Sequence, residues 1–331
     1  TATAPKMNTT IRRPLRFSPY YKQVIWGGRR ISAYKQTAVG SDSVGESWEV
    51  SAMPGYESRV IGCPELAGKT IAELIDLFGE DFLGTDVCRR FGHCFPLLIK
   101  IIDARENLSL QVHPGHDLAR SRHGAMGKTE MWYVVDTEPD SRIYCGLSAP
   151  LQKSDLETKA CDGSIMDSVA AYEARQRQFY LVPAGTLHTI GAGNLIIEVQ
   201  EPSDLTYRLY DFNRAGSDGA PRPLHIAEAR DAVNYAYPNT SVPTAEVFAQ
   251  TTLKAVCCDS FCVDFLQLKD NTHVLDTEGR TFAVVMVTEG ALTLSYEGGE
   301  EAVRAGETVL LPACIGRCEL HGDATALLIY C

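Results

Sequence analysis

Leu108-Ser109-Leu110-Gln111-Val112-His113-Pro114 alternates apolar and polar residues, which is the pattern of a β-strand with one buried face. The proline ends the strand, because it has no backbone N–H to give to a neighbouring strand. Gln111 and His113 stand two residues apart, so they project side by side from the polar face and offer an oxygen and a nitrogen as ligands. The segment predicts a wall strand of a β-barrel that holds a metal ion.

Two later segments supply further ligands. Lys128-Thr129-Glu130-Met131-Trp132-Tyr133 places Lys128 and Glu130 on one face of a strand, and Pro183-Ala184-Gly185-Thr186-Leu187-His188 brings a histidine after a tight turn. A single polar strand residue usually faces solvent, but this order of segments is typical of a cupin barrel. Together they predict a four-ligand N/O metal site, formed by Gln111, His113, Glu130 and His188.

The chain resembles the type I mannose-6-phosphate isomerases, in their short bacterial form. The resemblance rests on the combination of Gln111-x-His113-Pro114, Lys128-x-Glu130 and Ser203-Asp204 followed by Arg208. Further matching segments are residues 26–28, 45–51, 95–100, 183–188, 211–214 and 223–226, so that the resemblance runs from about residue 15 to about residue 240.

The resemblance implies a metal-dependent aldose-ketose isomerase that interconverts mannose 6-phosphate and fructose 6-phosphate. Such an enzyme moves a proton between C1 and C2 through an enediol or enediolate. The family implies one Zn²⁺ per chain at the four predicted ligands. The residue types alone leave Mn²⁺, Fe²⁺ and Co²⁺ open, because mixed N/O ligation suits each of them.

Several residues near the predicted ligands are candidates for catalysis and substrate binding. Arg208 matches the arginine that the family places at its active site, and Lys128 and Glu198 are the other predicted catalytic residues. Ser109 and Lys100, together with Lys128 and Arg208, are the predicted substrate-binding residues. Three structural alternatives stay open: Lys128 as a solvated lysine at a strand edge, Glu198 as an acceptor that orients His188 or Arg208, and Lys100 as a lysine that only extends from an apolar strand to water.

Composition and charge limit the classes of partner. The 331 residues carry a net charge of −11, which argues against a nucleic-acid partner, and they contain no apolar run long enough for a transmembrane helix. The expected partner is a small sugar phosphate, bound in a local basic pocket, with no membrane partner. The polar residues 1–10 are not expected to form a secretory signal, and the eleven cysteines are expected to be free thiols in the cytoplasm. The chain is expected to be a monomer or a homodimer.

The pattern along the chain predicts a mainly β protein with two cupin-like, jelly-roll barrels. Residues 1–240 are expected to form the catalytic domain with the metal site, interrupted by a helical insertion at 150–175. Residues 241–331 are expected to form a second cupin-like domain without metal, because residues 306–313 echo residues 179–184 but no histidine follows them.

Three helical regions are predicted in detail. One helix begins at Thr70, where Glu73 completes a capping box, and ends at Gly79. The insertion is expected to hold a helix capped by Ser154 and a second one over residues 166–174. A further helix is expected over residues 225–234.

Two other functions fit parts of the pattern. One is a different metal-cupin enzyme such as an oxygenase. Such an enzyme would typically use a His-x-His pair, or two histidines and a carboxylate, for iron, and the glutamine at position 111 argues against this class. The other is a non-catalytic cupin that binds a sugar phosphate, because a fold does not settle a function.

Overall fold

The structure, a computed structural model, describes residues 11–40, 43–240 and 252–331. Its contacts divide the chain into two compact units. One unit comprises residues 18–58 and 96–262, and the other comprises the residues up to Phe17, Arg59–Phe95 and Val263–Cys331. The fold is mainly β, as the sequence predicted.

The predicted domain boundary at residue 240 borders residues 241–251, which lie outside the described residues, and it stays a prediction. The contacts also show what a single boundary cannot describe: the residues up to Phe17 and residues 59–95 pack with the C-terminal strands. Leu15 forms a backbone bridge with Leu310, and the rings of Phe95 and Phe282 lie 4.9 Å apart. These contacts explain why residues 59–95 group with a part of the chain that is distant in sequence.

The unit with residues 18–58 and 96–262 is built from two antiparallel sheets. In the first, the strand order is β10-β7-β12-β5-β3-β2, and in the second it is β13-β6-β11-β8-β14, with β9 beside β8. The strands of the first sheet are β2 (Tyr20–Lys22), β3 (Glu46–Val50), β5 (Leu98–Ala104), β7 (Glu130–Thr137), β10 (Phe179–Val182) and β12 (Asn194–Gln200). Those of the second are β6 (Leu110–Val112), β8 (Arg142–Leu147), β9 (Val169–Glu173), β11 (His188–Ile190), β13 (Tyr207–Tyr210) and β14 (Asn239–Thr240).

The two sheets share one apolar core. Trp132 and Ile196 of the first sheet pack in the same cluster as Ile143 and Ile190 of the second. The strand β12 is buried along its whole length, because it is paired on both sides and covered on both faces. The strands that carry the predicted ligands, in both sheets, are therefore held by a close-packed interior.

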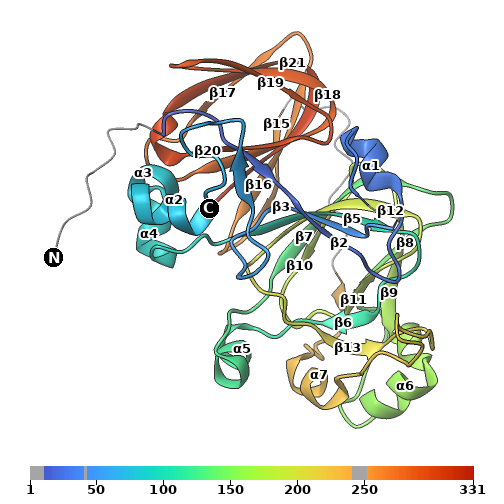
Figure 1. Cartoon of the computed structure of the whole chain (residues 1–331). Helices are drawn as coiled ribbons and strands as arrows, with labels where there is room; N and C mark the ends of the chain where they lie inside the picture. The colour runs from blue at the N-terminus through green and yellow to red at the C-terminus, as the bar shows by residue number, and fades with distance from the viewer. Residues whose placement is uncertain (1–10, 41–42, 241–251) are drawn as a thin grey trace. The chain divides into compact units, whose positions relative to one another are not determined.

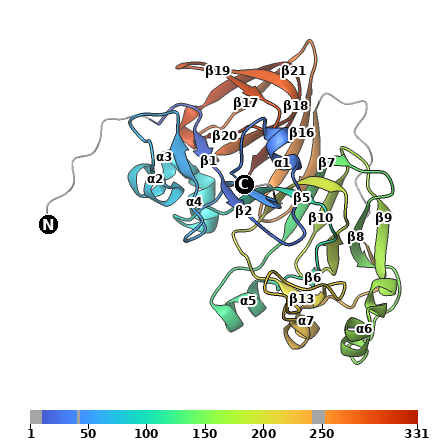
Figure 2. The ribbon, with the colours of Figure 1, turned by 45° about the vertical axis from the view of Figure 1, so that its right-hand side comes forward.

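Helices cover the edge of this unit near β6 and β13. Figures 1 and 2 show α5 (His116–His123), α6 (Leu156–Asp162) and α7 (Ile226–Ala232) gathered there. The prediction of a helix near residues 225–234 is confirmed by α7. The remaining helix of the unit is α1 (Arg30–Lys35), and no helix among the described residues has the length and apolar character to cross a membrane.

The predicted insertion is only partly helical. Its first helix is α6, but the residue before it, Asp155, makes no side-chain cap, so the predicted cap at Ser154 is wrong. A short 3-10 turn, η1 (Ser164–Ser168), follows, and residues 169–173 form strand β9 rather than a second helix. Pairing of β9 with β8 overrides the helix-forming alanines of this segment.

The other unit contains a sheet in which β16, β21, β18 and β19 pair in that order, with β17 on β21 and β20 on β18. Its interior is an apolar cluster that includes Leu266, Val285 and Leu320. Its strands are β16 (Cys262–Leu268), β17 (Thr272–Asp276), β18 (Ala283–Tyr296), β19 (Gly299–Arg304), β20 (Thr308–Leu311) and β21 (Arg317–Tyr330), together with the separate pair β1 (Arg16–Ser18) and β4 (Arg59–Ile61). The helices are α2 (Ile71–Phe78), α3 (Glu80–Leu83), α4 (Thr85–Phe91) and η2 (Ala313–Ile315).

The predicted helix that begins at Thr70 is α2, and its capping box is present. The Thr70 side chain accepts a hydrogen bond from the Glu73 N–H, and the Glu73 carboxylate accepts one from the Thr70 N–H. Gly79 ends the helix, as predicted.

The prediction of free cysteines is wrong for one pair. Cys257, at the end of β15 (Thr252–Cys257), forms a disulfide with Cys262, whereas the other nine cysteines form no disulfide.

A tight backbone approach fixes the loop that precedes α1. A Cβ on Gly28 would lie 2.1 Å from Oδ2 of Asp103, a buried carboxylate that accepts hydrogen bonds from the backbone N–H and the Nε–H of Arg30. Because these bonds hold the carboxylate in place, we expect Gly28→Ala to lower the free energy of unfolding by about 2–3 kcal/mol in urea titrations. Gly115→Ala is the control, since its Cβ would meet no atom within 4 Å and its loss should be smaller. Equal losses in the two variants would contradict this account.

Candidate metal centre

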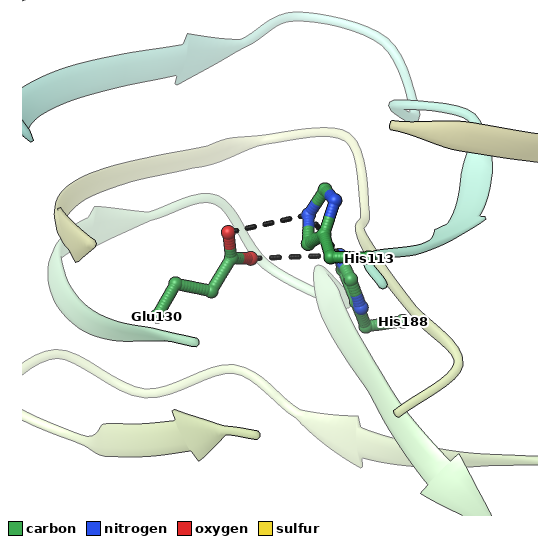
Figure 3. Close-up of side chains that lie close together, drawn as sticks. All are labelled: His113, Glu130 and His188. Carbon is green, nitrogen blue, oxygen red and sulfur yellow. Dashed lines mark hydrogen bonds and ion pairs between the residues drawn. The ribbon is translucent and has the colours of Figure 1, made fainter. Parts of the chain in front are cut away.

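Three of the predicted ligands meet in the interior of the unit formed by residues 18–58 and 96–262. His113 directly follows β6, Glu130 begins β7 and His188 begins β11. Nε2 of His113 lies 3.1 Å from Nε2 of His188 and 3.3 Å from Oε2 of Glu130, and Nε2 of His188 lies 3.4 Å from Oε1 of Glu130. Figure 3 shows the two rings and the carboxylate turned toward one another. All three side chains are at most 1% exposed.

Backbone carbonyls fix the orientation of both imidazole rings. Nδ1 of His113 lies 2.8 Å from the Leu205 carbonyl oxygen, and Nδ1 of His188 lies 2.8 Å from the Thr186 carbonyl oxygen. A carbonyl only accepts, so each Nδ1 carries the proton and each Nε2 presents a lone pair to the centre. Burial lowers the pKa of His113 to about 4 and also lowers the pKa of His188, so both rings are neutral.

The carboxylate completes a set of donors that suits a cation. Burial by itself would raise the pKa of Glu130, but the Lys128 ammonium, 2.6 Å from its Oε2, holds that pKa well below its ordinary value. Oε1 of Glu130 is buried and receives no hydrogen bond from any described residue. Two ring lone pairs and an ionised oxygen thus lie within 4.8 Å of one another, and these are donors that divalent metals use in proteins. The residues therefore fit a divalent metal of N/O preference.

Gln111 and Lys128 border this His113–Glu130–His188 cluster. Gln111 faces His188 across the β6–β11 pair, and its Nε2 lies 3.3 Å from Nε2 of His188. Amide nitrogen and oxygen differ here only by assignment, so a half-turn of the amide brings its oxygen to the cluster. The Lys128 ammonium also lies 3.0 Å from Nε2 of His113, so the alternative of a solvated strand-edge lysine is wrong. The role of Gln111 as the fourth ligand stays a prediction.

A cavity of about 320 Å³ opens beside the cluster and reaches it at Gln111 and Lys128. The same cavity is lined by the other predicted site residues, Ser109, Lys100, Glu198 and Arg208. All the predicted site residues therefore lie on the cavity wall or in the adjoining cluster. Basic side chains outnumber acidic ones on its wall. The basic ones are Lys22, Lys100, Lys128, Arg208 and Arg222, and the acidic ones are Glu46, Glu198 and Asp204.

A buried ion pair forms one part of the cavity wall. The Lys100 ammonium lies 2.9 Å from Oε2 of Glu198, whose Oε1 accepts a hydrogen bond from the Trp132 indole. Burial would lower the pKa of Lys100, but Glu198 and Glu46 raise it above its ordinary value. Lys100 is thus a buried cation rather than a lysine that extends to water. The Glu198 carboxylate contacts Trp132 and Lys100, and among the described residues it makes no hydrogen bond to His188 or Arg208, the two residues that it was predicted to orient in the structural alternative.

An arginine cluster forms another part of the wall, and sequence reasoning missed most of it. Arg208 is paired with Gln111 in the β13–β6 register, its Nη1 donates to the Pro223 carbonyl, and its Nε is buried without a partner among the described residues. Asp211 accepts hydrogen bonds from both Arg214 and Arg222, at 2.7 and 2.6 Å for the shortest contacts. Burial and the charge of Arg222 lower the pKa of Arg208. Asp211 therefore holds Arg222 beside Arg208, although nothing in the sequence pattern places these residues together.

Comparisons with known proteins identify the family to which the chain is similar. A family model described as the catalytic domain of type I phosphomannose isomerases matches residues 15–140, and one described as the cupin domain of mannose-6-phosphate isomerase matches residues 251–331. The chain is 32% identical over 318 residues to a putative mannose-6-phosphate isomerase of Bacillus subtilis, YvyI, covering 95% of this chain and 98% of the relative. It is 31% identical over 316 residues to the mannose-6-phosphate isomerase of Streptococcus mutans, covering 94% and 96%.

Solved structures show the same architecture. The mannose 6-phosphate isomerase of Bacillus subtilis is similar with a TM-score of 0.86 and 30% sequence identity, covering 96% of this chain and 99% of that one. A putative mannosephosphate isomerase of Archaeoglobus fulgidus, at 20% identity and a TM-score of 0.78 with 96% and 97% coverage, shares the fold. The predicted cupin architecture is confirmed by these matches.

Proposed function

The chain belongs to the type I mannose-6-phosphate isomerases, and from that premise we propose that it interconverts mannose 6-phosphate and fructose 6-phosphate. The observation that supports this function best is the His113–Glu130–His188 cluster at a cavity with a surplus of basic side chains. The cluster suits a metal, and the basic wall suits an anionic sugar phosphate. Both features lie in one described unit of the chain.

The metal ligands in this proposal are Gln111, His113, Glu130 and His188, and the expected ion is Zn²⁺. Two imidazoles and a carboxylate are ordinary zinc donors, and a solved mannose 6-phosphate isomerase of the same fold is described as bound with zinc and yttrium. When bound, the ion would act as a Lewis acid that stabilises negative charge on the two adjacent sugar oxygens. The carbonyls of Leu205 and Thr186 keep both rings turned so that their Nε2 lone pairs are available for it.

The proton transfer itself needs a group that removes a proton from one carbon and returns it to the next. Glu198 is suited to this task, because the Trp132 N–H and the Lys100 ammonium hold its carboxylate at the cavity wall. Lys128 lies between the ligand cluster and the cavity and can donate to a sugar oxygen. Arg208, with its unpartnered Nε, can stabilise the charge of an enediolate.

The phosphate group is expected to bind at the basic side of the cavity. Lys100 is its proposed contact, with Ser109 as a hydroxyl donor, and the structure adds Arg222 on the same wall. Because nine of the eleven cysteines form no disulfide, the cytoplasm remains the proposed place of action.

A coupled assay with mannose 6-phosphate, before and after treatment with a chelator, tests the function. Turnover should fall at least about tenfold when the metal is removed and should return on addition of Zn²⁺, since the family function requires the cluster to be loaded. Additions of Mn²⁺ and Co²⁺ identify the preferred ion. Full activity in chelated protein that metal analysis shows to be empty would contradict the metal-dependent mechanism. Binding of metal and sugar phosphate without turnover under any condition would instead favour the non-catalytic cupin.

A further inference from the structure

A second buried glutamate, Glu201, lies just outside the metal cluster and is not among the proposed ligands. It is 2% exposed and accepts hydrogen bonds from three donors. Oε2 accepts from the Thr129 backbone N–H at 2.7 Å, and Oε1 accepts from the Ser260 hydroxyl at 2.7 Å. Nε2 of His116 lies 3.0 Å from Oε1, and because Nδ1 of His116 accepts from the Gly127 N–H, this Nε2 carries the proton and donates.

Glu201 contacts Thr129, the residue between Lys128 and Glu130, through both its side chain and its backbone. The contact is double, since the Glu201 backbone N–H also donates to the Thr129 carbonyl at 3.1 Å. This double contact lies next to the antiparallel pair formed by Gln200 and Glu130. The backbone on the N-terminal side of the ligand Glu130 is thereby fixed from both its N–H and its carbonyl.

Thr129 passes this restraint on to another ligand segment. Its hydroxyl accepts a hydrogen bond from the Ala184 N–H at 3.3 Å, at the start of the turn that leads to His188. In the same turn, the Gly185 N–H donates to the carbonyl of His113 at 2.8 Å. One residue, Thr129, therefore connects Glu201 with the segments that carry Glu130, His188 and His113.

We propose that Glu201 is a positioning residue of the metal centre, which sets metal affinity by holding Thr129 and through it the segments that carry the ligands. The inference rests on the proposed metal centre. Outer hydrogen-bond partners of metal ligands typically account for a 10–100-fold effect on affinity. Glu201 acts one step further out, on the backbone beside a ligand, and it acts on several ligand segments at once.

The test is the dissociation constant for Zn²⁺, measured without substrate by competition with a chromophoric chelator on the full chain. Glu201→Ala should weaken zinc binding by about 10–100-fold. Glu201→Gln keeps an oxygen at the same reach for the Thr129 N–H and should bind zinc within about fivefold of wild type. Glu201→Asp keeps the charge but is one methylene too short to make the bond, and should weaken binding by about tenfold. The Co²⁺ absorption spectrum should change in Glu201→Ala and Glu201→Asp but not in Glu201→Gln.

Glu49→Ala is the matched control, because Glu49 is an equally buried carboxylate of the same unit that binds Lys35 and Ser47. It should lower thermal stability and leave the zinc dissociation constant unchanged. If Glu201→Ala behaves in the same way, the inference is wrong and Glu201 has only a structural role. If Glu201→Ala does not fold, the zinc dissociation constants of the other two variants are compared. Tighter binding by Glu201→Gln than by Glu201→Asp supports the inference, and equal binding by the two overturns it. A wild-type chain that binds no zinc would overturn the metal centre as well, whereas normal wild-type binding with unchanged variants overturns this inference alone.

Discussion

Replacement of His113 by alanine should remove bound metal and isomerase activity together. Its Nε2 lies 3.1 Å from Nε2 of His188 and 3.3 Å from Oε2 of Glu130, so it contacts both other members of the cluster. Without it, only one imidazole and one carboxylate remain beside the Gln111 amide, and an amide is not among the ordinary zinc donors, so tight binding should be lost. We expect the metal affinity to fall by more than about 100-fold, since even outer partners of metal ligands account for 10–100-fold.

The measurement is metal content by mass spectrometry after gel filtration, together with the coupled assay at saturating mannose 6-phosphate. His188→Ala should behave in the same way, because the structure gives the two rings equivalent carbonyl partners and equivalent burial. His321→Ala, in strand β21 of the other unit, serves as the control and should keep full metal and activity. Retention of stoichiometric metal by His113→Ala would show that the cluster is not the metal site.

The ligand strands could be predicted from sequence because their side-chain directions follow from local geometry. A period of two places residues 111 and 113 on one face whatever the strand packs against, and the same holds for Lys128 and Glu130. The capping box at Thr70 is equally local, since both of its hydrogen bonds join residues three apart. The structure brings these predicted residues together at one cavity.

Other features depend on contacts between distant segments and leave no periodic signal. The carbonyl that orients His113 belongs to Leu205, 92 residues later, and the Glu201–Ser260 bond joins loops 59 residues apart. The segment over residues 169–173 has alanines that favour a helix, but its pairing with β8 makes it a strand. The grouping of residues 59–95 with the C-terminal strands also arises from tertiary packing alone. Sequence periodicity therefore locates the predicted ligands, whereas the contacts that position their side chains become visible only in the folded chain.

Replacement of Arg208 by alanine should leave the metal in place and reduce turnover. Arg208 contacts none of the three residues of the cluster, and its described partners are the Pro223 carbonyl and the His225 ring at its backbone N–H. Its side chain lines the cavity, where a bound substrate can reach it. A lost hydrogen bond to a charged group costs about 1.5–3 kcal/mol, which corresponds to a loss of about 10–150-fold in kcat/KM.

The division of that loss between kcat and KM shows what Arg208 binds. If the guanidinium stabilises charge that develops during proton transfer, kcat should fall while KM stays nearly constant. A rise in KM with an unchanged kcat would instead assign Arg208 to uniform binding of the phosphate. Arg222→Ala gives the comparison, because Asp211 holds Arg222 on the same wall but Arg222 is not paired in register with Gln111. Arg120→Ala, on α5 and outside the cavity wall, should be neutral. Both arginines line the cavity, but only Arg208 is paired with Gln111, the residue that borders the metal cluster. We therefore expect a fall in kcat for Arg208→Ala and a rise in KM for Arg222→Ala. Wild-type kinetics in Arg208→Ala would remove Arg208 from the proposed site.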